Sequence, residues 1–227
     1  MIGSLGQPLL FLLAFGFGFG SIYQRAEGGN YIQFLAPGII AMSVLFMAVF
    51  SGIELIWDRQ FGFLKETMVA PVSRWEIMLG RTLGGATIAT MQGLIVFVLT
   101  LLAGFRPQTI LKSFLALGFV FIIALLFTSL GTAIASLLED MQGFPIIMNF
   151  LVMPIFFFSG ALFPLKGLPK VIQLLTTLDP LTYGVDGIRE ALSHTGVHGM
   201  ATDFLVLSLV TLFLLGLGVH LFEKIQI

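Results

Sequence analysis

The chain of 227 residues contains no cysteine, and only 10% of its residues are charged. The missing cysteines exclude disulfide bonds, thiolate catalysis and cysteine-ligated metal sites. The 11 Lys and Arg residues are nearly balanced by 12 Asp and Glu residues, and they form no dense basic cluster. A protein that binds nucleic acid through its phosphates needs such a cluster, so this class of partner is excluded.

The scarcity of charge accompanies a content of 57% hydrophobic residues, which is too high for a soluble domain. Uncharged runs long enough to cross a bilayer as helices recur along the chain, and they lack the alternation of barrel strands. Helices also pair every backbone polar group inside hydrocarbon. We therefore predict an all-α, polytopic membrane protein with a single transmembrane domain over residues 1–227. Its six predicted spans lie at about residues 5–23, 34–56, 76–103, 113–138, 143–162 and 203–222.

A charged island, Trp57–Ile77, separates the second and third predicted spans. Asp58–Met68 fits an amphipathic helix of about three turns, with apolar side chains on one face at spacings of three and four residues. Pro71 disfavours helical geometry at the residue before it and should end this helix. Ser73 and Glu76 then fit a capping box that opens the third span. These residues alone predict either a helix at the lipid headgroups or a docking surface for a soluble partner.

The orientation of the spans follows only in part from the distribution of charge. An even number of spans places both termini on one side, but Lys and Arg residues occur on both sides, so the positive-inside rule does not settle the orientation. The charge density of the island favours the cytoplasm. We expect a multi-pass protein of the inner or plasma membrane with both termini in the cytoplasm.

Five ordered blocks of sequence are similar to those of a known family. They are YIQFLAPGIIAM (31–42), GIELIWDRQFGFLKETMVAPVSR (52–74), LGRTLGGA (79–86), FSGALFPL (158–165) and LDPLTYGVDGIREAL (178–192). With these blocks the chain strongly resembles the ABC-2 family of transporter permeases, especially the drug-resistance and nodulation-type exporters. Members usually carry a cytoplasmic segment and a connecting helix before the first span, whereas this chain starts almost directly at Gly3. We expect either a short member or one with a truncated start.

The resemblance implies a permease subunit that homodimerises and works with a separate ATP-binding-cassette ATPase. ATP and Mg²⁺ would bind to that ATPase, and this chain would bind no cofactor and would not itself be an enzyme. The sequence agrees, because it contains no G-x-x-x-x-G-K-[ST] phosphate-binding loop. The expected partners are the ATPase, a second copy of the chain and membrane lipid.

The family places the loop between spans two and three against the ATPase as a cytoplasmic coupling helix, and the resemblance assigns Asp58–Val69 to this role. Phe61, Leu64 and Met68 would fill a groove on the ATPase, while charged neighbours would form ion pairs that set the register. The candidate coupling residues are Asp58, Arg59, Phe61, Gly62, Leu64, Lys65, Glu66, Met68, Pro71 and Arg74.

The resemblance also places the translocation path between the two copies, lined mainly by spans two and five. These spans would form an uncharged aromatic wall that suits export of hydrophobic, amphipathic or lipid- or glycan-like cargo. The alternative is packing or lipid contact, which is the commoner role of aromatic and Met residues in a span. The candidate path residues are Phe46, Phe50, Met153, Phe156 and Phe157.

The segment between the fifth and sixth spans is predicted to contain a helix. Asp179 and Pro180 fit an N-cap and a first helical position, and the helix should run to about Leu192. The resemblance makes this an extracellular re-entrant region. Its charged side chains should face water or one another, and they are Asp186, Arg189 and Glu190.

Two further hypotheses concern a metal site and a different class of transporter. His194 and His198 have a spacing that suits a metal ion on a helix, but Gly196 lies between them and no carboxylate evidently completes a ligand set, so we predict no metal site.

The competing function is a secondary transporter or channel driven by an ion gradient. Such proteins usually carry ionisable residues near the midplane and often an internal repeat. The centres of spans three, four and five carry no formal charge, and no repeat is evident.

Overall fold

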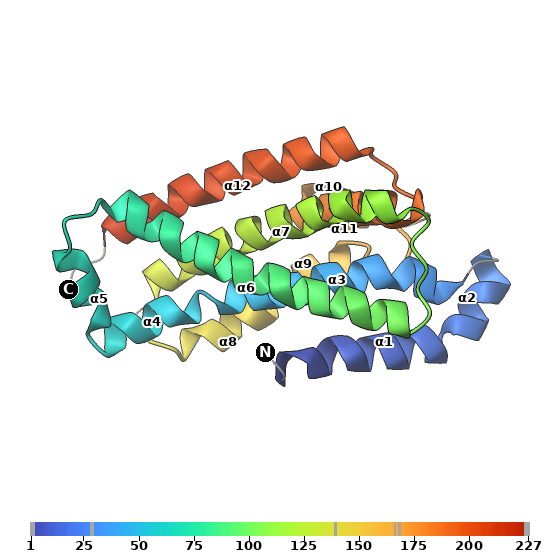
Figure 1. Ribbon diagram of the computed structural model, residues 1–227, viewed down its shortest axis with the longest axis horizontal. Coiled ribbons are helices and arrows are strands. Elements are labelled where there is room, and N and C mark those ends of the chain that lie inside the picture. Colours follow the sequence, from blue (N-terminus) through green and yellow to red (C-terminus); the bar gives the residue numbers. More distant parts are fainter. Residues whose placement is uncertain (1–2, 28–29, 139, 166, 168, 225–227) are drawn as a thin grey trace.

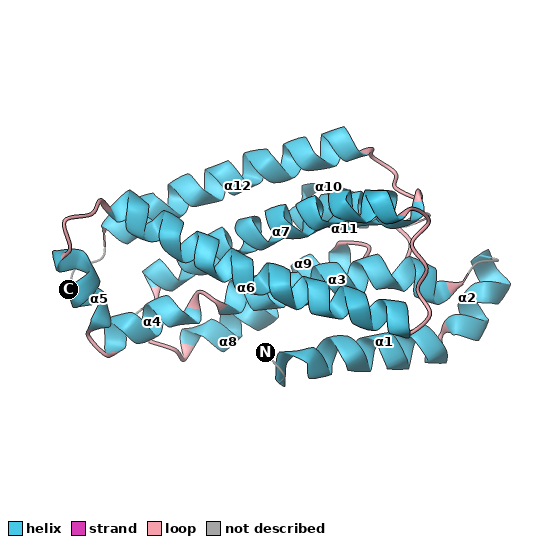
Figure 2. Ribbon diagram, in the orientation of Figure 1, coloured by secondary structure: helices cyan, strands magenta, loops and turns pink. Residues whose placement is uncertain are grey.

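The computed structural model describes residues 3–27, 30–138, 140–165, 167 and 169–224, and every regular element in these ranges is helical. Figure 1 shows an elongated bundle whose long helices run between two ends, and Figure 2 shows short connections concentrated at those ends. The all-α prediction is confirmed. Four helical segments are long and apolar enough to cross a membrane, and two apolar segments are shorter. The long ones are Tyr31–Gln60, Arg74–Leu102, Lys112–Leu137 and Met200–Glu223, and the shorter ones are Gly6–Gly18 and Gly143–Phe158.

The helices follow one another through the chain with few long connections. They are α1 (Gly6–Gly18), α2 (Gly20–Glu27), α3 (Tyr31–Phe50), α4 (Ile53–Gln60), α5 (Phe63–Val69), α6 (Arg74–Leu102), α7 (Ile110–Leu137), α8 (Gly143–Ile147), α9 (Met153–Phe158), α10 (Lys170–Leu178), α11 (Pro180–Ser193) and α12 (Met200–Glu223).

Helix α7 forms the centre of the bundle, where it packs against α3, α6, α11 and α12. Its side chains at Ile123, Ala124 and Phe127 are fully buried. The chain between α3 and α4 approaches α7 at backbone distance, because a Cβ atom on Gly52 would lie 2.4 Å from the carbonyl oxygen of Gly131. Small residues permit this kind of helix contact in membranes.

The first predicted span, residues 5–23, is divided in the structure. Helix α1 ends at Gly18 and α2 begins at Gly20, with Phe19 between them. Glycine is the weakest helix former after proline, so two glycines flanking Phe19 favour a break there. The 13 residues of α1 cover roughly 20 Å at 1.5 Å per residue.

The fifth predicted span, residues 143–162, is helical only to Phe158 and changes its hydrogen-bond pattern on the way. Pro154 has no N–H group, so the regular bond to the residue four positions earlier cannot form. The chain adopts a π-helical segment, Met148–Val152, directly before it, and the amide of Met153 donates to the carbonyl of Met148. The interruption at Pro154 therefore takes the form of a π-bulge.

Candidate functional site

The charged island lies at the end of the bundle where α4, α5, the start of α6 and the end of α12 meet (Figure 1). Its helical part is two helices, because α4 ends at Gln60 and α5 begins at Phe63. Gly62 adopts a left-handed conformation with φ 81°, which glycine tolerates without a steric penalty. The prediction of one continuous helix over Asp58–Met68 is therefore wrong.

The break at Gly62 also changes which apolar side chains of the island face outward. Leu64 is fully buried, and Met68 is partly buried against the core. Phe61, Phe63 and Val69 are exposed instead. The predicted docking face of Phe61, Leu64 and Met68 is thus wrong for Leu64, whereas Phe61 is exposed and Met68 is partly exposed. Sequence reasoning missed Phe63 because it continued the helical period through Gly62.

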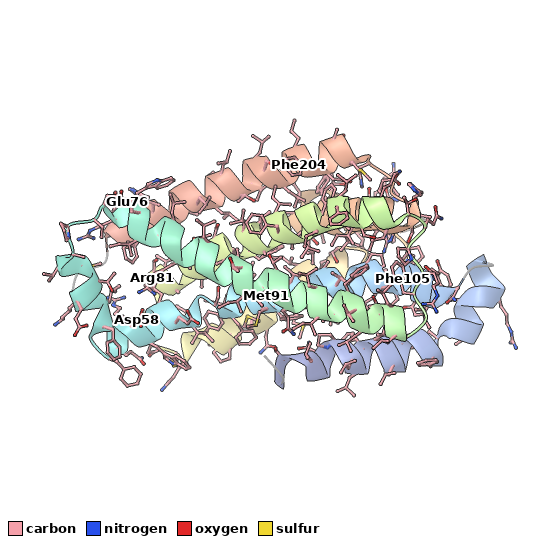
Figure 3. All side chains as sticks on the ribbon, viewed as in Figure 1. Asp58, Glu76, Arg81, Met91, Phe105 and Phe204 are labelled. Atoms are coloured by element: carbon pink, nitrogen blue, oxygen red, sulfur yellow. The ribbon has the colours of Figure 1, made fainter. Side chains whose placement is uncertain are left out.

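The charged candidates divide into those that hold the island to the bundle and those that face away from it. Asp58 accepts a hydrogen bond from Arg81 at 2.5 Å, which joins α4 to α6. Both residues are labelled in Figure 3. The guanidinium of Arg59 donates to the carbonyl of Leu138 at 3.3 Å. Lys65 and Glu66 on α5 are exposed. These last two are the charged side chains of α5 that are available to a partner.

The end of the island has the local structure that the sequence predicted. Helix α5 ends before Pro71, with Ala70 in an extended conformation. Ser73 and Glu76 form the capping box, in which the Glu76 carboxylate accepts from the Ser73 amide at 2.7 Å. Arg74 donates to the carbonyl of Glu223 at 2.7 Å, so a cation lies at the C-terminus of α12. A cation at this position interacts favourably with the dipole of α12. The hydrogen bond also links α6 to α12.

Two candidate path residues lie inside the protein. Phe46 on α3 and Phe156 on α9 are buried, with their rings in a T-shaped contact at 6.0 Å. Phe11 on α1 packs against Phe156 at 5.9 Å, and Met153 is partly buried against the core. In the single chain these side chains pack three helical segments together, which is the alternative role that the sequence analysis named.

The other two candidate path residues, Phe50 and Phe157, are exposed. Further exposed apolar side chains, Ile146 and Phe150, come from the helical segment Gly143–Phe158, which also carries Phe157. Their spacing of four residues places them on one side of this segment. Sequence reasoning did not single out Ile146 and Phe150, although this spacing was visible. We call Phe50, Ile146, Phe150 and Phe157 the exposed aromatic face.

The opposite end of the bundle contains a cavity of about 1000 Å³ that is lined mostly by residues with polar side chains. It lies beside the N-terminal part of α3, the chain between α6 and α7, α10, and the C-terminal part of α11. Side-chain amides, hydroxyls and two guanidinium groups contribute to its lining, among them Asn30, Gln33, Gln108, Gln173, Thr177, Arg106 and Arg189.

Arg189 is the partly buried cation of this cavity, whereas Arg106 is exposed, and α11 holds Arg189 in place. Its guanidinium lies over the ring of Phe34 at 4.2 Å and donates to the carbonyl of Gly160 at 3.1 Å. Burial lowers the pKa of Arg189 to about 10, although the charge of Asp186 raises it. The guanidinium therefore stays charged at neutral pH. A charged cation at a polar cavity is suited to anionic or hydroxylated groups.

The prediction that Asp186, Arg189 and Glu190 face water or one another is wrong for Asp186. Its carboxylate is buried and accepts hydrogen bonds from the backbone amides of Val197 and His198, at 2.9 and 2.8 Å. Glu190 accepts from the amide of Gly196 at 2.9 Å. The acidic side chains of α11 thus hold the loop that leads to α12.

The N-cap of α11 is confirmed. Asp179 accepts a hydrogen bond from the amide of Leu181 at 2.9 Å, and the helix runs from Pro180 to Ser193. The second carboxylate oxygen of Asp179 is buried without a partner in the described part of the chain. Burial raises the pKa of Asp179 to about 8, although the bond from Leu181 lowers it.

The histidine spacing noted in the sequence does not form a helical pair. Helix α11 ends at Ser193, and His194 is left-handed, with its ring 3.0 Å from the Lys112 amino group. A different group could hold a metal ion, and it consists of Asp186, His198 and Asp203. These residues come from α11, a loop and α12, so no local spacing could have revealed them.

Comparison with known proteins identifies the family. The family model described as "ABC-2 type transporter" matches residues 1–193. The chain belongs to this family. The predicted resemblance is therefore confirmed, and this ABC-2 permease is a multi-pass membrane protein of transport function.

Curated relatives of the ABC-2 permease give the same assignment. "Putative transport permease ycf38" of Cyanophora paradoxa is 29% identical over 202 residues, covering 86% of this chain and 68% of the relative. "Nodulation protein J" of Rhizobium leguminosarum bv. trifolii is 30% identical over 191 residues, covering 83% and 72%. The protein of the same name from Sinorhizobium fredii is 26% identical over 226 residues, covering 99% and 86%.

Proposed function

We propose that this ABC-2 permease is the membrane subunit of an exporter that is driven by a separate ATP-binding-cassette subunit. The observation that carries the proposal is the surface of α5, which presents apolar and charged side chains at one end of the bundle. We call Phe61, Phe63, Lys65, Glu66 and Val69 the α5 surface. ATP and Mg²⁺ would be bound by the partner, since the chain has no phosphate-binding loop.

The contacts behind the α5 surface suit a coupling element. Leu64 anchors α5 in the core, the Asp58–Arg81 pair joins α4 to α6, and Arg74 binds the end of α12. A displacement of α5 by the ATPase would therefore move several membrane helices together. Closure of the ATPase subunits would shift the permease between inward- and outward-facing states, because the contacts differ in the two states.

Six spans with both termini in the cytoplasm of an inner or plasma membrane remain the topology that we propose. The four long apolar helices would supply four spans. The apolar segments Gly6–Gly18 and Gly143–Phe158 would supply the first and fifth. Helices α10 and α11, which contribute residues to the lining of the polar cavity, lie away from the end of the bundle that contains α5 (Figure 1), which suits an extracellular position for them.

The cargo path is proposed to lie between two copies of the chain. The exposed aromatic face would then meet its equivalent or the hydrophobic part of a cargo, whereas Phe46 and Phe156 would support it from within. The polar cavity with Arg189 would receive a sugar or an anionic headgroup near the outer surface. The proposed substrate class is therefore an amphipathic, lipid- or glycan-like molecule.

A pair of phenylalanine substitutions tests the coupling assignment. Phe61 and Phe114 are both 71% exposed, but Phe61 lies on the α5 surface and Phe114 near the start of α7 at the other end. We expect Phe61→Ala to weaken co-purification of the ATP-binding subunit and to reduce transport, with the permease dimer intact. Phe114→Ala should leave both unchanged. Unchanged ATPase binding and transport in Phe61→Ala, or cargo movement without any ATPase, would contradict the proposal.

A further inference from the structure

Three ligand-type side chains meet where α11, the loop 194–199 and α12 come together. They are Asp186 on α11, His198 in the loop and Asp203 in the first turn of α12. One carboxylate oxygen of each Asp and one ring nitrogen of His198 all lie within 4.8 Å of one another. These residues are distant from the α5 surface, and the coupling mechanism does not use them.

Asp203 provides an independent sign that something is bound here. Its side chain is 0% exposed, and neither carboxylate oxygen has a hydrogen-bond partner in the described part of the chain. A buried carboxylate without a hydrogen bond or a counter-charge is strongly unfavourable. Both of its oxygens are therefore free to serve as ligands, and one of them points into the group.

The other two side chains are already oriented. The Asp186 carboxylate accepts from the amides of Val197 and His198, which fixes the loop around it. The Nδ1 atom of His198 lies 3.2 Å from the Asp186 carboxylate, and the ring packs against Tyr183 at 5.2 Å. Both Asp186 and His198 also line the polar cavity, which gives a small ion a route from the surface.

We propose that Asp186, His198 and Asp203 bind a divalent transition-metal ion, for which Zn²⁺ is the best fit. Zinc takes imidazole nitrogen and carboxylate oxygen at about 2.0–2.2 Å in tetrahedral geometry. Two such ligands are then roughly 3.4 Å apart, close to the 3.2 Å between His198 and Asp186. Asp203 would complete the site by a small shift of its side chain, and water would occupy the fourth position.

The charge and the number of ligands support this ion class. Two carboxylates and a neutral imidazole carry a charge of about −2, which a divalent cation neutralises. Calcium requires six to eight oxygen ligands, more than these side chains offer. The ion would fasten α11 to the start of α12, so its effect is on the outer half of the permease and is separate from ATPase docking.

Zinc titration of the purified full-length protein tests the site. The protein is stripped with a chelator, and Zn²⁺ binding to the stripped protein is measured by isothermal titration calorimetry. A second sample is dialysed against Zn²⁺ for elemental analysis and thermal unfolding. We expect one Zn²⁺ per chain and a rise in the unfolding temperature. Asp203→Asn and His198→Ala should each weaken the affinity at least about tenfold.

Two features keep the outcome interpretable. Asp203→Asn removes a buried charge with little change in shape, so it should fold at least as well as the wild type without zinc. His194→Asn is the matched control, because His194 lies outside the group and asparagine tolerates its left-handed backbone. The proposal is overturned if the wild type binds no Zn²⁺ at micromolar concentration. It is equally overturned if Asp203→Asn and His198→Ala bind as tightly as His194→Asn.

Discussion

The two ends of this bundle differ in the exposure of their acidic side chains. At the end that contains α5, charged side chains are exposed or partly exposed, as in the Asp58–Arg81 pair and at Glu66. At the end that contains α11, Asp186 and Asp203 are buried. Exposed charges contribute little to stability and are available for recognition, whereas buried ones must be satisfied internally.

The apolar side chains of α5 and α11 differ in the same direction. Phe61, Phe63 and Val69 are exposed on the α5 surface, whereas Leu181, Val185 and Ile188 of α11 are buried. Helix α5 therefore has the composition of a surface that is covered by another protein, and α11 has that of a structural element. We expect substitutions at the first end to affect coupling and those at the second end to affect stability.

The largest effect on stability is expected for Asp186→Ala. The substitution leaves the amides of Val197 and His198 without their acceptor. Each hydrogen bond to a charged group contributes about 1.5–3 kcal/mol, so we expect a loss of about 4 kcal/mol. Chemical unfolding in detergent measures this loss. A change below about 1 kcal/mol would show that the outer end does not depend on its buried charge.

Leu64→Ala should have the next largest effect and is an exception at the coupling end. Leu64 is the fully buried residue of α5, and truncation of a buried leucine costs about 2–5 kcal/mol. The permease should lose stability and ATPase binding together, whereas Phe61→Ala loses only binding. If Leu64→Ala were as stable as the wild type in the same unfolding experiment, the role of Leu64 as the anchor of α5 would be contradicted.

Asp179→Asn should change the pH dependence of stability. The pKa of Asp179 is raised from 3.8 to about 8, so the folded state holds its proton more tightly than the unfolded state. The associated stabilisation is complete below pH 3.8 and is lost as the pH rises to about 8. Asparagine keeps the N-cap acceptor without titrating. Unfolding midpoints at pH 5 and 8 should differ less in the variant, and an identical difference would contradict the assignment.

Asp58→Ala should have the smallest effect on stability. The Asp58–Arg81 pair is partly exposed, and pairs of this kind contribute about 0–1 kcal/mol. Set against Asp186→Ala, this variant compares the same substitution at the two ends. We expect unfolding to be nearly unchanged and transport to be reduced, because α4 and α6 are less firmly joined. A loss of stability as large as that of Asp186→Ala would abolish the distinction between the ends.

Local sequence signals predicted the local structure well. The capping box of Ser73 and Glu76, the end of α5 before Pro71 and the start of α11 at Asp179 all follow from side chains that bond within a few residues. The apolar runs also predicted the long helices α6 and α7, because hydropathy and length determine a span directly.

The features that sequence reasoning missed depend on one backbone angle or on contacts between distant segments. The positive φ of Gly62 turned Leu64 inward and Phe63 outward, and a helical period cannot anticipate such a rotation. The group of Asp186, His198 and Asp203 requires the packing of α11 against α12. These interactions are set by tertiary structure, so a spacing pattern does not contain them.

Cross-linking from single cysteines tests the central claim, because the natural chain has no cysteine to interfere. Val69 on the α5 surface is 86% exposed, and Val197 at the opposite end is 72% exposed. Each is replaced by cysteine and treated in native membranes with a photoactivated maleimide, and azido-ATP then labels any attached ATPase. We predict an ATP-labelled adduct from Val69→Cys and none from Val197→Cys. No adduct from Val69→Cys, or equal adducts from both, would contradict the assignment of α5 as the ATPase contact.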